Sequence, residues 1–415
     1  MIRSIAKQTY QGNTMNVRHM LTNFLYSVTP SMHKIRRQSL ENCILSAAMK
    51  NHLTVTSLGR GLGTKAYEKH RIKSADRLLS NLNLHREIPD IYCEISRLFL
   101  SGLAQPVLLV DWSDMEPEQK NFLLRAALVC QGRSITVYEE VHPLERKDKP
   151  ATHRQFLDNL KTIVPASCKP IVVTDAGFRG PWFRQILETG WDYVGRVRHQ
   201  TQYEAEPDNW QPCKSLYEQA SEKVMWFNDV SVAKSNPFET TLVLYKGSSK
   251  GRHALNRKGK PKRSGTSLNA AEGWKEPWLL ATSLEVETSA QASAVVKRYG
   301  ARMQIEESFR DHKSERFGLG MNMHKTKSTQ RLMVLVMIGT LSCLYLHQLG
   351  LLARDAGLAR RFQANTEKRR HVLSCVFLGA RILATRVEDM AVENEFELIE
   401  RFRQHTAEYA VRWAA

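Results

Sequence analysis

Apolar side chains recur at helical spacing through the first hundred residues. One set runs through residues 20–25 and another through residues 40–47. A short helix is predicted around residues 53–58, where it ends at a glycine-rich turn, and a second amphipathic helix occupies residues 72–79. The N-terminal part of the chain is therefore expected to be helical.

The two short helices on either side of that turn resemble a helix-turn-helix. Basic side chains lie in the turn and along the second helix, among them Lys73 and Arg77. DNA contact is one interpretation of this pattern; an ordinary helical hairpin with a solvated basic face is the other. We expect residues 1–100 to form a helical DNA-binding domain.

From about residue 101 the pattern changes to short apolar runs that are typical of strands. The five runs are PVLLVDWSD, NFLLRAALVC, RSITVYEEVH, KPIVVTDAGF and WDYVGRVR. Two amphipathic helices, HRQFLDNLKTIV and PWFRQILETG, separate the last three runs. Three strands, a helix, a strand, a helix and a strand predict a mixed α/β core, of which residues 101–199 are the first part.

Residues 200–281 interrupt this order and are expected to be a β-rich insertion, with FETTLVLYKG and EPWLLATSL as strands. Between these strands, residues 246–263 contain eight Lys or Arg and no acid, and their glycine, serine and proline favour a flexible loop. A solvated loop is one interpretation, but an acid-free cationic loop of this length suits a phosphate backbone better. The candidate DNA contacts in it are Lys258, Lys260, Lys262 and Arg263.

Helices dominate from residue 290 to the end. We expect residues 282–355 to complete the core and residues 356–415 to form a helical C-terminal region, a candidate for dimerisation. The uncharged segment 332–353 is long enough to cross a bilayer. However, it contains His347 and Gln348, is broken by Thr340 and Ser342, and has no second span beside it. A buried core helix is the better prediction.

The composition adds a strong charge bias. The 415 residues include 60 Lys and Arg against 42 Asp and Glu, a formal charge of +18. This excess favours a polyanionic partner, either nucleic acid or an anionic membrane surface. The seven cysteines are scattered and form no C-x-x-C pair, which fits a reducing compartment and argues against a disulfide framework or a zinc finger. The first twenty residues have no apolar run, so they are not expected to be a secretory signal, and Met15 is a candidate second start.

Two acids stand at the ends of buried strands, Asp111 after VLLV and Asp175 after IVVT. If the strands are neighbours, the two carboxylates lie close together and repel each other unless a cation neutralises them. Oxygen ligands without a nearby His or Cys cluster favour Mg²⁺ or Mn²⁺. Taken alone, each acid is equally well explained as a turn former at a strand end.

A third acid lies in KRYGARMQIEESFRDHKSER. On one continuous helix, at 100° per residue, four side chains share a stripe about 60° wide: Tyr299, Arg302, Glu306 and Lys313. Arg310 extends this stripe. An adjacent apolar stripe, which would dock the helix on the sheet, consists of Ala301, Ile305 and Phe309. In the first stripe, one carboxylate is flanked by an arginine, a lysine and a phenol, which suits a metal ligand next to a phosphate. The alternative is a surface helix with an Arg302–Glu306 ion pair.

Tyr, Arg, Glu and Lys with gaps of two, three and six residues match the YREK signature of the IS-four family of bacterial insertion-sequence transposases. The chain resembles the IS-ten type most closely. The resemblance covers most of the chain: LLVDWSD, the DAGF block, SKSNP, EPWLLAT, RMQIEESFRD, and QANT followed by VLS. The spacings agree as well, with 64 residues from Asp111 to Asp175 and 131 from Asp175 to Glu306.

This resemblance implies a ribonuclease-H-like mixed sheet flanked by helices and interrupted by the insertion. It implies that Asp111, Asp175 and Glu306 form a DDE triad that holds two Mg²⁺ ions, for which Mn²⁺ substitutes. Tyr299, Arg302 and Lys313 would hold the phosphate next to the cut. Trp278 would stack on a base flipped out at the transposon end, the alternative being a core tryptophan. Met303 stands where some relatives have an aromatic residue.

The implied activity is cut-and-paste transposition by metal-dependent phosphoryl transfer. Water cuts one strand at the transposon end, the freed 3′-OH attacks the opposite strand to form a hairpin, water reopens the hairpin, and the 3′-OH joins target DNA. Assembly of two ends implies a homodimer. The resemblance also implies a bacterial cytoplasmic location at the nucleoid, with double-stranded DNA as partner and no membrane.

Three other functions are alternatives. A ribonuclease-H-fold nuclease would cut without joining. A DNA-binding regulator or inactive relic would bind DNA without metal, even after Asp111→Ala, and the intact triad argues against it. A membrane-associated protein would use the segment 332–353.

Overall fold

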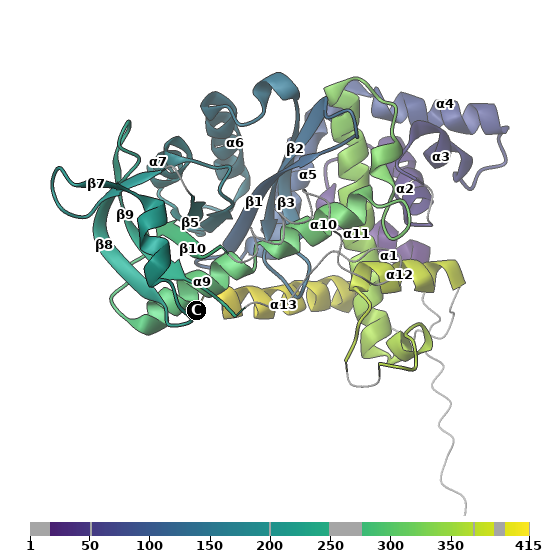
Figure 1. Cartoon of the computed structure of the whole chain (residues 1–415). Helices are drawn as coiled ribbons and strands as arrows, with labels where there is room; N and C mark the ends of the chain where they lie inside the picture. The colour runs from purple at the N-terminus through teal and green to yellow at the C-terminus, as the bar shows by residue number, and fades with distance from the viewer. Residues whose placement is uncertain are drawn as a thin grey trace, which may run out of the picture.

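The computed structural model describes residues 17–49, 52–198, 201–248, 276–367, 370–385 and 395–414. Its centre is a ten-stranded mixed sheet with the order β3-β2-β1-β4-β5-β10-β9-β8-β6-β7 (Figure 1). The strands are β1 (Val107–Asp114), β2 (Asn121–Leu128), β3 (Ile135–Pro143), β4 (Ile171–Thr174), β5 (Asp192–Val197), β6 (Gln202–Glu204), β7 (Trp210–Pro212), β8 (Met225–Val232), β9 (Phe238–Tyr245) and β10 (Trp278–Thr282).

The sheet is mixed because its two halves are connected differently. β1, β4 and β5 run parallel, while β2 and β3 form an antiparallel hairpin beside β1. β10 runs antiparallel to both β5 and β9, so the β-rich insertion continues the core sheet and does not form a separate one. This confirms the predicted mixed α/β fold flanked by helices and is consistent with a ribonuclease-H-like core.

Helices cover both faces of the sheet. They are α1 (Val17–Val28), α2 (Lys34–Ala48), α3 (Val55–Arg60), α4 (Glu68–Leu79), α5 (Leu82–Leu100), α6 (Pro150–Ile163), α7 (Gly180–Glu188), α9 (Ser289–Gly300), α10 (Met303–Lys313), α11 (Thr329–Asp355), α12 (Cys375–Thr385) and α13 (Glu395–Ala414). Short 3₁₀ turns are η1 (Leu144–Arg146), η2 (Cys213–Gln219), η3 (Met321–Met323) and η4 (Leu358–Arg361).

The alternation of side chains along β1 shows which helix lies on which face. Asp111 and Trp112 are consecutive, so their side chains point to opposite faces of the sheet. Asp111 contacts Arg302 at the start of α10, whereas the indole of Trp112 donates a hydrogen bond to His153 of α6 (3.1 Å). α6 packs with α7, and α10 therefore lies on the opposite face from both of them.

Helix α11 is the buried helix that the sequence predicts for residues 332–353. It spans 27 residues and has the length and composition of a membrane span, but 89% of its most apolar window is buried inside the protein. Its neighbours include α2, α5, α12 and β3. Small residues allow the closest approach, since a Cβ on Gly350 would lie 1.9 Å from the carbonyl oxygen of Cys375 in α12.

The segment around the YREK residues is not the one continuous helix that the sequence predicts. α9 ends at Gly300 and α10 begins at Met303, and the turn between them is tightened by i→i+3 bonds such as Arg302 N to Tyr299 O (3.0 Å). The break follows Gly300, the last residue of α9 and a poor helix former. The predicted stripe of four side chains is therefore interrupted after Tyr299.

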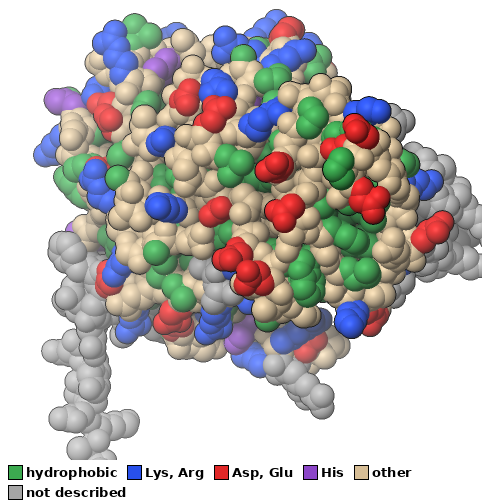
Figure 2. Space-filling view, turned by 90° about the vertical axis from the view of Figure 1, so that its left-hand side faces the viewer, with side chains coloured by type: hydrophobic (Ala, Val, Ile, Leu, Met, Phe, Trp, Pro, Cys, Tyr) green, Lys and Arg blue, Asp and Glu red, His purple; other side chains and the backbone are tan. Residues whose placement is uncertain are grey.

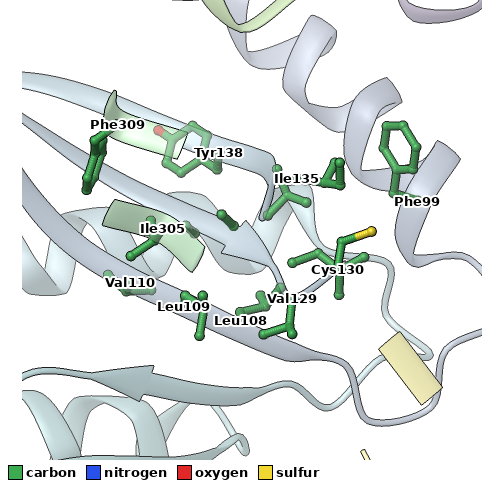
Figure 3. Close-up of a cluster of buried hydrophobic side chains, with 14 of the residues drawn as sticks. Phe99, Leu108, Leu109, Val110, Val129, Cys130, Ile135, Tyr138, Ile305 and Phe309 are labelled. Carbon is green, nitrogen blue, oxygen red and sulfur yellow. The ribbon is translucent and has the colours of Figure 1, made fainter. Parts of the chain in front are cut away.

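The apolar stripe of this segment is buried as predicted. Ala301, Ile305 and Phe309 are 2%, 0% and 4% exposed, and all three belong to the hydrophobic core. Figure 3 shows Ile305 and Phe309 among apolar side chains of β1 and the β2–β3 hairpin. These contacts seat α10 on the sheet beside the strand that carries Asp111.

The predicted helix-turn-helix pair is formed by α3 and α4, which pack against α2. Two contacts join this region to later parts of the chain: Leu53 N, just before α3, donates to Leu319 O (2.9 Å), and Arg331 forms an ion pair with Asp76 of α4 (2.7 Å). These helices are thus fixed to the segment that follows α10.

Candidate active site

Two acids meet at the end of neighbouring parallel strands. β1 and β4 pair in register as far as Leu109 and Val173, and continuing that register by two residues sets Asp111 beside Asp175. Neighbouring strands lie about 4.8 Å apart. Both strands are apolar up to the acid, so the sheet core holds the backbone while the carboxyl groups reach its edge.

The Asp111 carboxyl group lies in a poorly solvated position, with 13% of its side chain exposed. Burial raises its pKa to about 7, and the negative charges of Asp175 and Glu306 contribute to the increase. Arg302 and the backbone N–H of Trp112, which donates to Oδ1 at 2.8 Å, oppose it. A positive charge near the other carboxylate oxygen, Oδ2, therefore stabilises the ionised form of Asp111.

Arg302 supplies that positive charge. Its Nη1 lies 3.1 Å from Asp111 Oδ2 and 2.8 Å from Glu306 Oε1. Burial lowers the pKa of the guanidinium, but the surrounding anions, Asp175 included, outweigh burial and raise it. Two of the three acids therefore contact one permanently charged group and the third acts on it electrostatically, and the predicted Arg302–Glu306 ion pair is formed.

The acids are not gathered into a ready-made metal cage. Within the part of the chain that the structure describes, no three His, Cys, Asp or Glu side chains lie close enough together to hold an ion. Asp175 uses Oδ1 to accept from Gly177 N (2.8 Å) in a turn, and the Glu306 side chain is 44% exposed. Metal binding therefore requires Glu306 and Arg302 to change their contacts.

Lys313 lies at the other end of α10. Its Nζ forms an ion pair with Asp114 Oδ1 (2.8 Å), at the last residue of β1. Asp114 is the second acid of the VDWSD run. The side chains of Lys313 and Asp114 are 32% and 45% exposed, so both are accessible to a ligand that lies along α10.

Tyr299 and Trp278 form a separate aromatic unit. Their rings meet edge to face at 4.8 Å, and Trp278, the first residue of β10, is half-buried. Tyr299 is only 5% exposed, and its burial raises the pKa of the phenol. Its hydroxyl interacts with Arg196 of β5, a basic residue that the sequence pattern did not single out.

The remaining basic candidates lie away from the triad or outside the described residues. Arg310 forms an ion pair with Glu307. Lys73 pairs with Asp76 (3.6 Å), and Arg77 is in the last turn of α4. The four basic loop residues lie outside the described residues: Lys258, Lys260, Lys262 and Arg263.

The side of the molecule that carries β7, β8 and β9 is of mixed charge. Figure 2 shows Asp and Glu side chains interspersed with Lys and Arg on that face. In the sequence, residues 201–248 hold seven acids and four bases. The cationic character of the insertion therefore comes from the loop sequence and not from its described strands.

A comparison with protein families adds an independent finding. The family model described as transposase DDE domain matches residues 102–343, which is 242 of 415 residues and more than half of the chain. The matched region begins just before β1 and ends within α11, so it includes Asp111, Asp175 and Glu306. A search of curated proteins found no match.

Proposed function

The chain belongs to the transposase DDE domain family, and from this premise we propose that it is a cut-and-paste DNA transposase of the IS-four, IS-ten type. One observation carries the proposal: the Arg302 guanidinium binds Asp111 at the end of β1 and Glu306 of α10 directly, and the charge of Asp175 at the end of the neighbouring strand acts on it as well. Acids placed in this way are suited to phosphoryl transfer, and DNA is the substrate on which transposases act.

The donor set fits divalent metal ions. Asp111, Asp175 and Glu306 offer only carboxylate oxygens, the ligand type that Mg²⁺ and Mn²⁺ prefer. The pKa of Asp111, raised to about 7, marks a place where added positive charge is stabilising. These three residues would hold two Mg²⁺ ions, or Mn²⁺ in their place, which supply Lewis-acid activation of the attacking and leaving oxygens.

Arg302 and Lys313 are proposed to bind the phosphate at the cut. A guanidinium presents five N–H donors in a planar fork, and that of Arg302 already binds two carboxylate oxygens. A phosphodiester, like a carboxylate, shares one negative charge between two oxygens that a guanidinium can bind, so Arg302 can exchange a carboxylate for the substrate. Lys313 can exchange Asp114 for a neighbouring phosphate in the same way.

Each proposed step exchanges one P–O bond for another. Water attacks the phosphorus at the transposon end, the P–O3′ bond breaks, and the departing 3′ oxygen gains a proton. That 3′-OH attacks the opposite strand, which forms a hairpin and frees the flanking DNA. Water opens the hairpin, and the same 3′-OH then attacks a target phosphate. All four are in-line displacements, so one set of residues serves each in turn.

Trp278 is proposed to hold the base that leaves the helix when the hairpin forms. Its ring is half-buried and supported by Tyr299, so its remaining surface is a rigid platform. Stacking on such a platform stabilises an unpaired base by roughly 1–3 kcal/mol. Trp278→Ala should reduce hairpin formation more than the first nick, measured as the ratio of the two products over time.

We also propose how the chain is organised. Residues 1–100 bind the transposon end, residues 101–199 and 282–355 form the catalytic core, residues 200–281 insert the basic loop, and residues 356–415 help two copies pair. Two copies would hold two ends in one complex, in the cytoplasm at the bacterial nucleoid. The +18 formal charge supports a polyanionic partner for such an assembly.

The test uses the purified full chain, a labelled transposon-end duplex and Mg²⁺. Nicked and hairpin strands should appear on a denaturing gel with the wild type and with Glu307→Gln, but not with Glu306→Gln. Glu307 is a matched control because it is the next residue on α10 and its carboxylate pairs with Arg310. Cutting without strand transfer would identify a nuclease, and undiminished cutting by Glu306→Gln would refute the triad.

A further inference from the structure

Helix α10 has a polar face that points away from the side bearing Glu306. At 100° per residue, this face lies roughly opposite Glu306. Its four residues, spaced i, i+4, i+7 and i+8, are Gln304, Ser308, Asp311 and His312. From the sequence, a polar stripe of this kind would be expected to face solvent. In the structure, three of its four residues are buried.

Each residue of this face binds the β2–β3 hairpin, and we call the four contacts the polar seam. They are Cys130 N to Gln304 Oε1 (2.9 Å), Ser308 Oγ to Ser134 O (3.1 Å), Arg133 Nε to Asp311 Oδ2 (2.8 Å) and Arg125 Nη2 to His312 Nδ1 (3.2 Å). The seam therefore joins the helix that carries Glu306 to the strand that pairs with β1.

Arg125 makes the seam contact with His312 and connects the seam to other parts of the core. It is the register partner of Asp111 on the neighbouring strand, so it lies directly beside the first acid of the triad. Its side chain is completely buried and forms an ion pair with Glu139 of β3, also completely buried, at 2.7 Å. Its guanidinium also lies 4.8 Å from the ring centre of Phe309. One side chain thus contacts both β3 and α10.

Glu139 extends the same network to two more helices. Its carboxylate accepts hydrogen bonds from Tyr92 of α5 (2.6 Å) and from Thr340 of α11. A cavity of about 30 Å³ borders Arg125, Asp311 and Thr340, which is room for one water molecule beside the guanidinium. Nη1 of Arg125 has no hydrogen-bond partner among the described residues, whereas the other buried hydrogen bonds of Arg125 and Glu139 hold the network in one arrangement.

The seam differs in kind from the apolar contacts of α10. Ile305 and Phe309 bury surface, but apolar packing is non-directional and tolerates a small rotation of the helix about its axis. Hydrogen bonds between buried groups weaken steeply when their angles change. A rotation of α10 would break the seam on one side and move Glu306 relative to Asp111 on the other.

We propose that Arg125 is a positioning residue for Glu306: through the polar seam it fixes the rotation of α10, and with it the separation of the Glu306 and Asp111 carboxylates. This inference rests on the proposed role of the triad. Arg125 does not touch substrate or metal, and its effect passes through His312 and Phe309. Residues that orient metal ligands in this way typically change metal affinity 10–100-fold when they are removed.

The test removes both charges of the buried pair together, in Arg125→Met/Glu139→Leu, because breaking only one partner leaves an unpaired buried charge. A second variant, Gln304→Met/Ser308→Ala, cuts the other end of the seam without touching a charge. The control is Arg37→Met, a buried arginine of α2 that binds backbone carbonyls of residues 29, 30 and 32. Mn²⁺ binding is measured by calorimetry on each full-length chain, with DNA affinity and melting temperature recorded alongside.

We expect the seam variants to bind Mn²⁺ at least tenfold more weakly and to need correspondingly more Mn²⁺ for half-maximal cleavage, with unchanged DNA affinity. Arg37→Met should melt at a lower temperature but bind Mn²⁺ like the wild type. Wild-type Mn²⁺ affinity in either folded seam variant would overturn the role of the seam and leave the proposed role of the triad standing. Wild-type Mn²⁺ binding that survives Asp111→Asn would overturn the triad, and the seam proposal with it.

Discussion

Replacing Arg302 by methionine removes the positive charge that lies between two proposed metal ligands. Arg302 binds the Asp111 carboxylate at 3.1 Å and the Glu306 carboxylate at 2.8 Å. A metal ion that uses the same oxygens must displace it. Arg302 therefore competes with metal before DNA arrives, and methionine, which keeps the apolar stem, removes only the competitor.

The magnitude follows from the exposure of each pair. A hydrogen bond to a charged partner contributes about 1.5–3 kcal/mol when it is poorly solvated, as the Asp111 contact is. The Glu306 side chain is 44% exposed, so its helical pair with Arg302 contributes only about 0.3–0.5 kcal/mol. Together these contacts amount to about 2–3.5 kcal/mol, and removing them should tighten Mn²⁺ binding roughly 30–300-fold.

The pH of the assay decides whether this gain is visible. Arg302 holds the pKa of Asp111 down, so the pKa, already about 7, rises further in the variant. Below that pKa a proton takes the place of the metal on Asp111, and the gain disappears. Calorimetry at pH 9 without DNA should therefore show tighter Mn²⁺ binding by Arg302→Met, and the advantage should shrink as the pH falls.

Cleavage should change in the opposite direction, since Arg302 is also proposed to hold the phosphate. Arg154→Met is the control: Arg154 pairs with Glu188 and is on α6, on the opposite face of the sheet from α10, so both metal affinity and cleavage should stay at the wild-type level. Unchanged or weaker Mn²⁺ binding by Arg302→Met at pH 9 would refute the competition.

Three further predictions test the loop, the buried histidine and the helix packing. Neutralising the basic loop should lower the slope of log affinity against log salt by up to about 3.6, and an equal slope would exclude the loop from the DNA interface. The loop residues to change are Lys258, Lys260, Lys262 and Arg263. Burial lowers the pKa of His153 to about 4, so the unfolded state takes up its proton first as the pH falls from 6.5 to 4, and the free energy of unfolding decreases by up to about 3 kcal/mol. Urea unfolding of His153→Gln should show a smaller decrease over the same pH range, and an identical decrease would contradict this. Gly350→Ala should lower the melting temperature by several degrees, through roughly 1–3 kcal/mol of overpacking against Cys375, whereas Gly63→Ala, with open space around it, should not.

The strands and most helices could be predicted because their signals are local. VLLVD and IVVTD are apolar runs that end in an acid, and the structure makes them adjacent parallel strands. The burial of Ile305 and Phe309 followed from helical spacing alone. The order of strands and helices along the chain was sufficient to predict the mixed sheet, because parallel strands with helical crossovers leave few arrangements.

The contacts of the charged groups could not be predicted in the same way. Nothing near Asp311 or His312 in the sequence indicates burial, because their partners Arg133 and Arg125 are almost two hundred residues away. The same holds for Lys313, whose partner Asp114 is on another element. Spacing gives the face on which a charge lies, but only the fold decides whether that face meets solvent or a buried partner.

The break between α9 and α10 lets Tyr299 and Glu306 meet different packing requirements. Tyr299 must lie against Trp278 on the side of β10, whereas Glu306 must face Asp111 at the end of β1. On a single straight helix, the rotation of 100° per residue would fix the angle between the Tyr299 and Glu306 side chains. The turn that follows Gly300 removes that coupling. The proposed base platform and the proposed metal ligands can therefore each be fixed by their own neighbours, which explains why a signature that fits one helical stripe on paper is built from two helices.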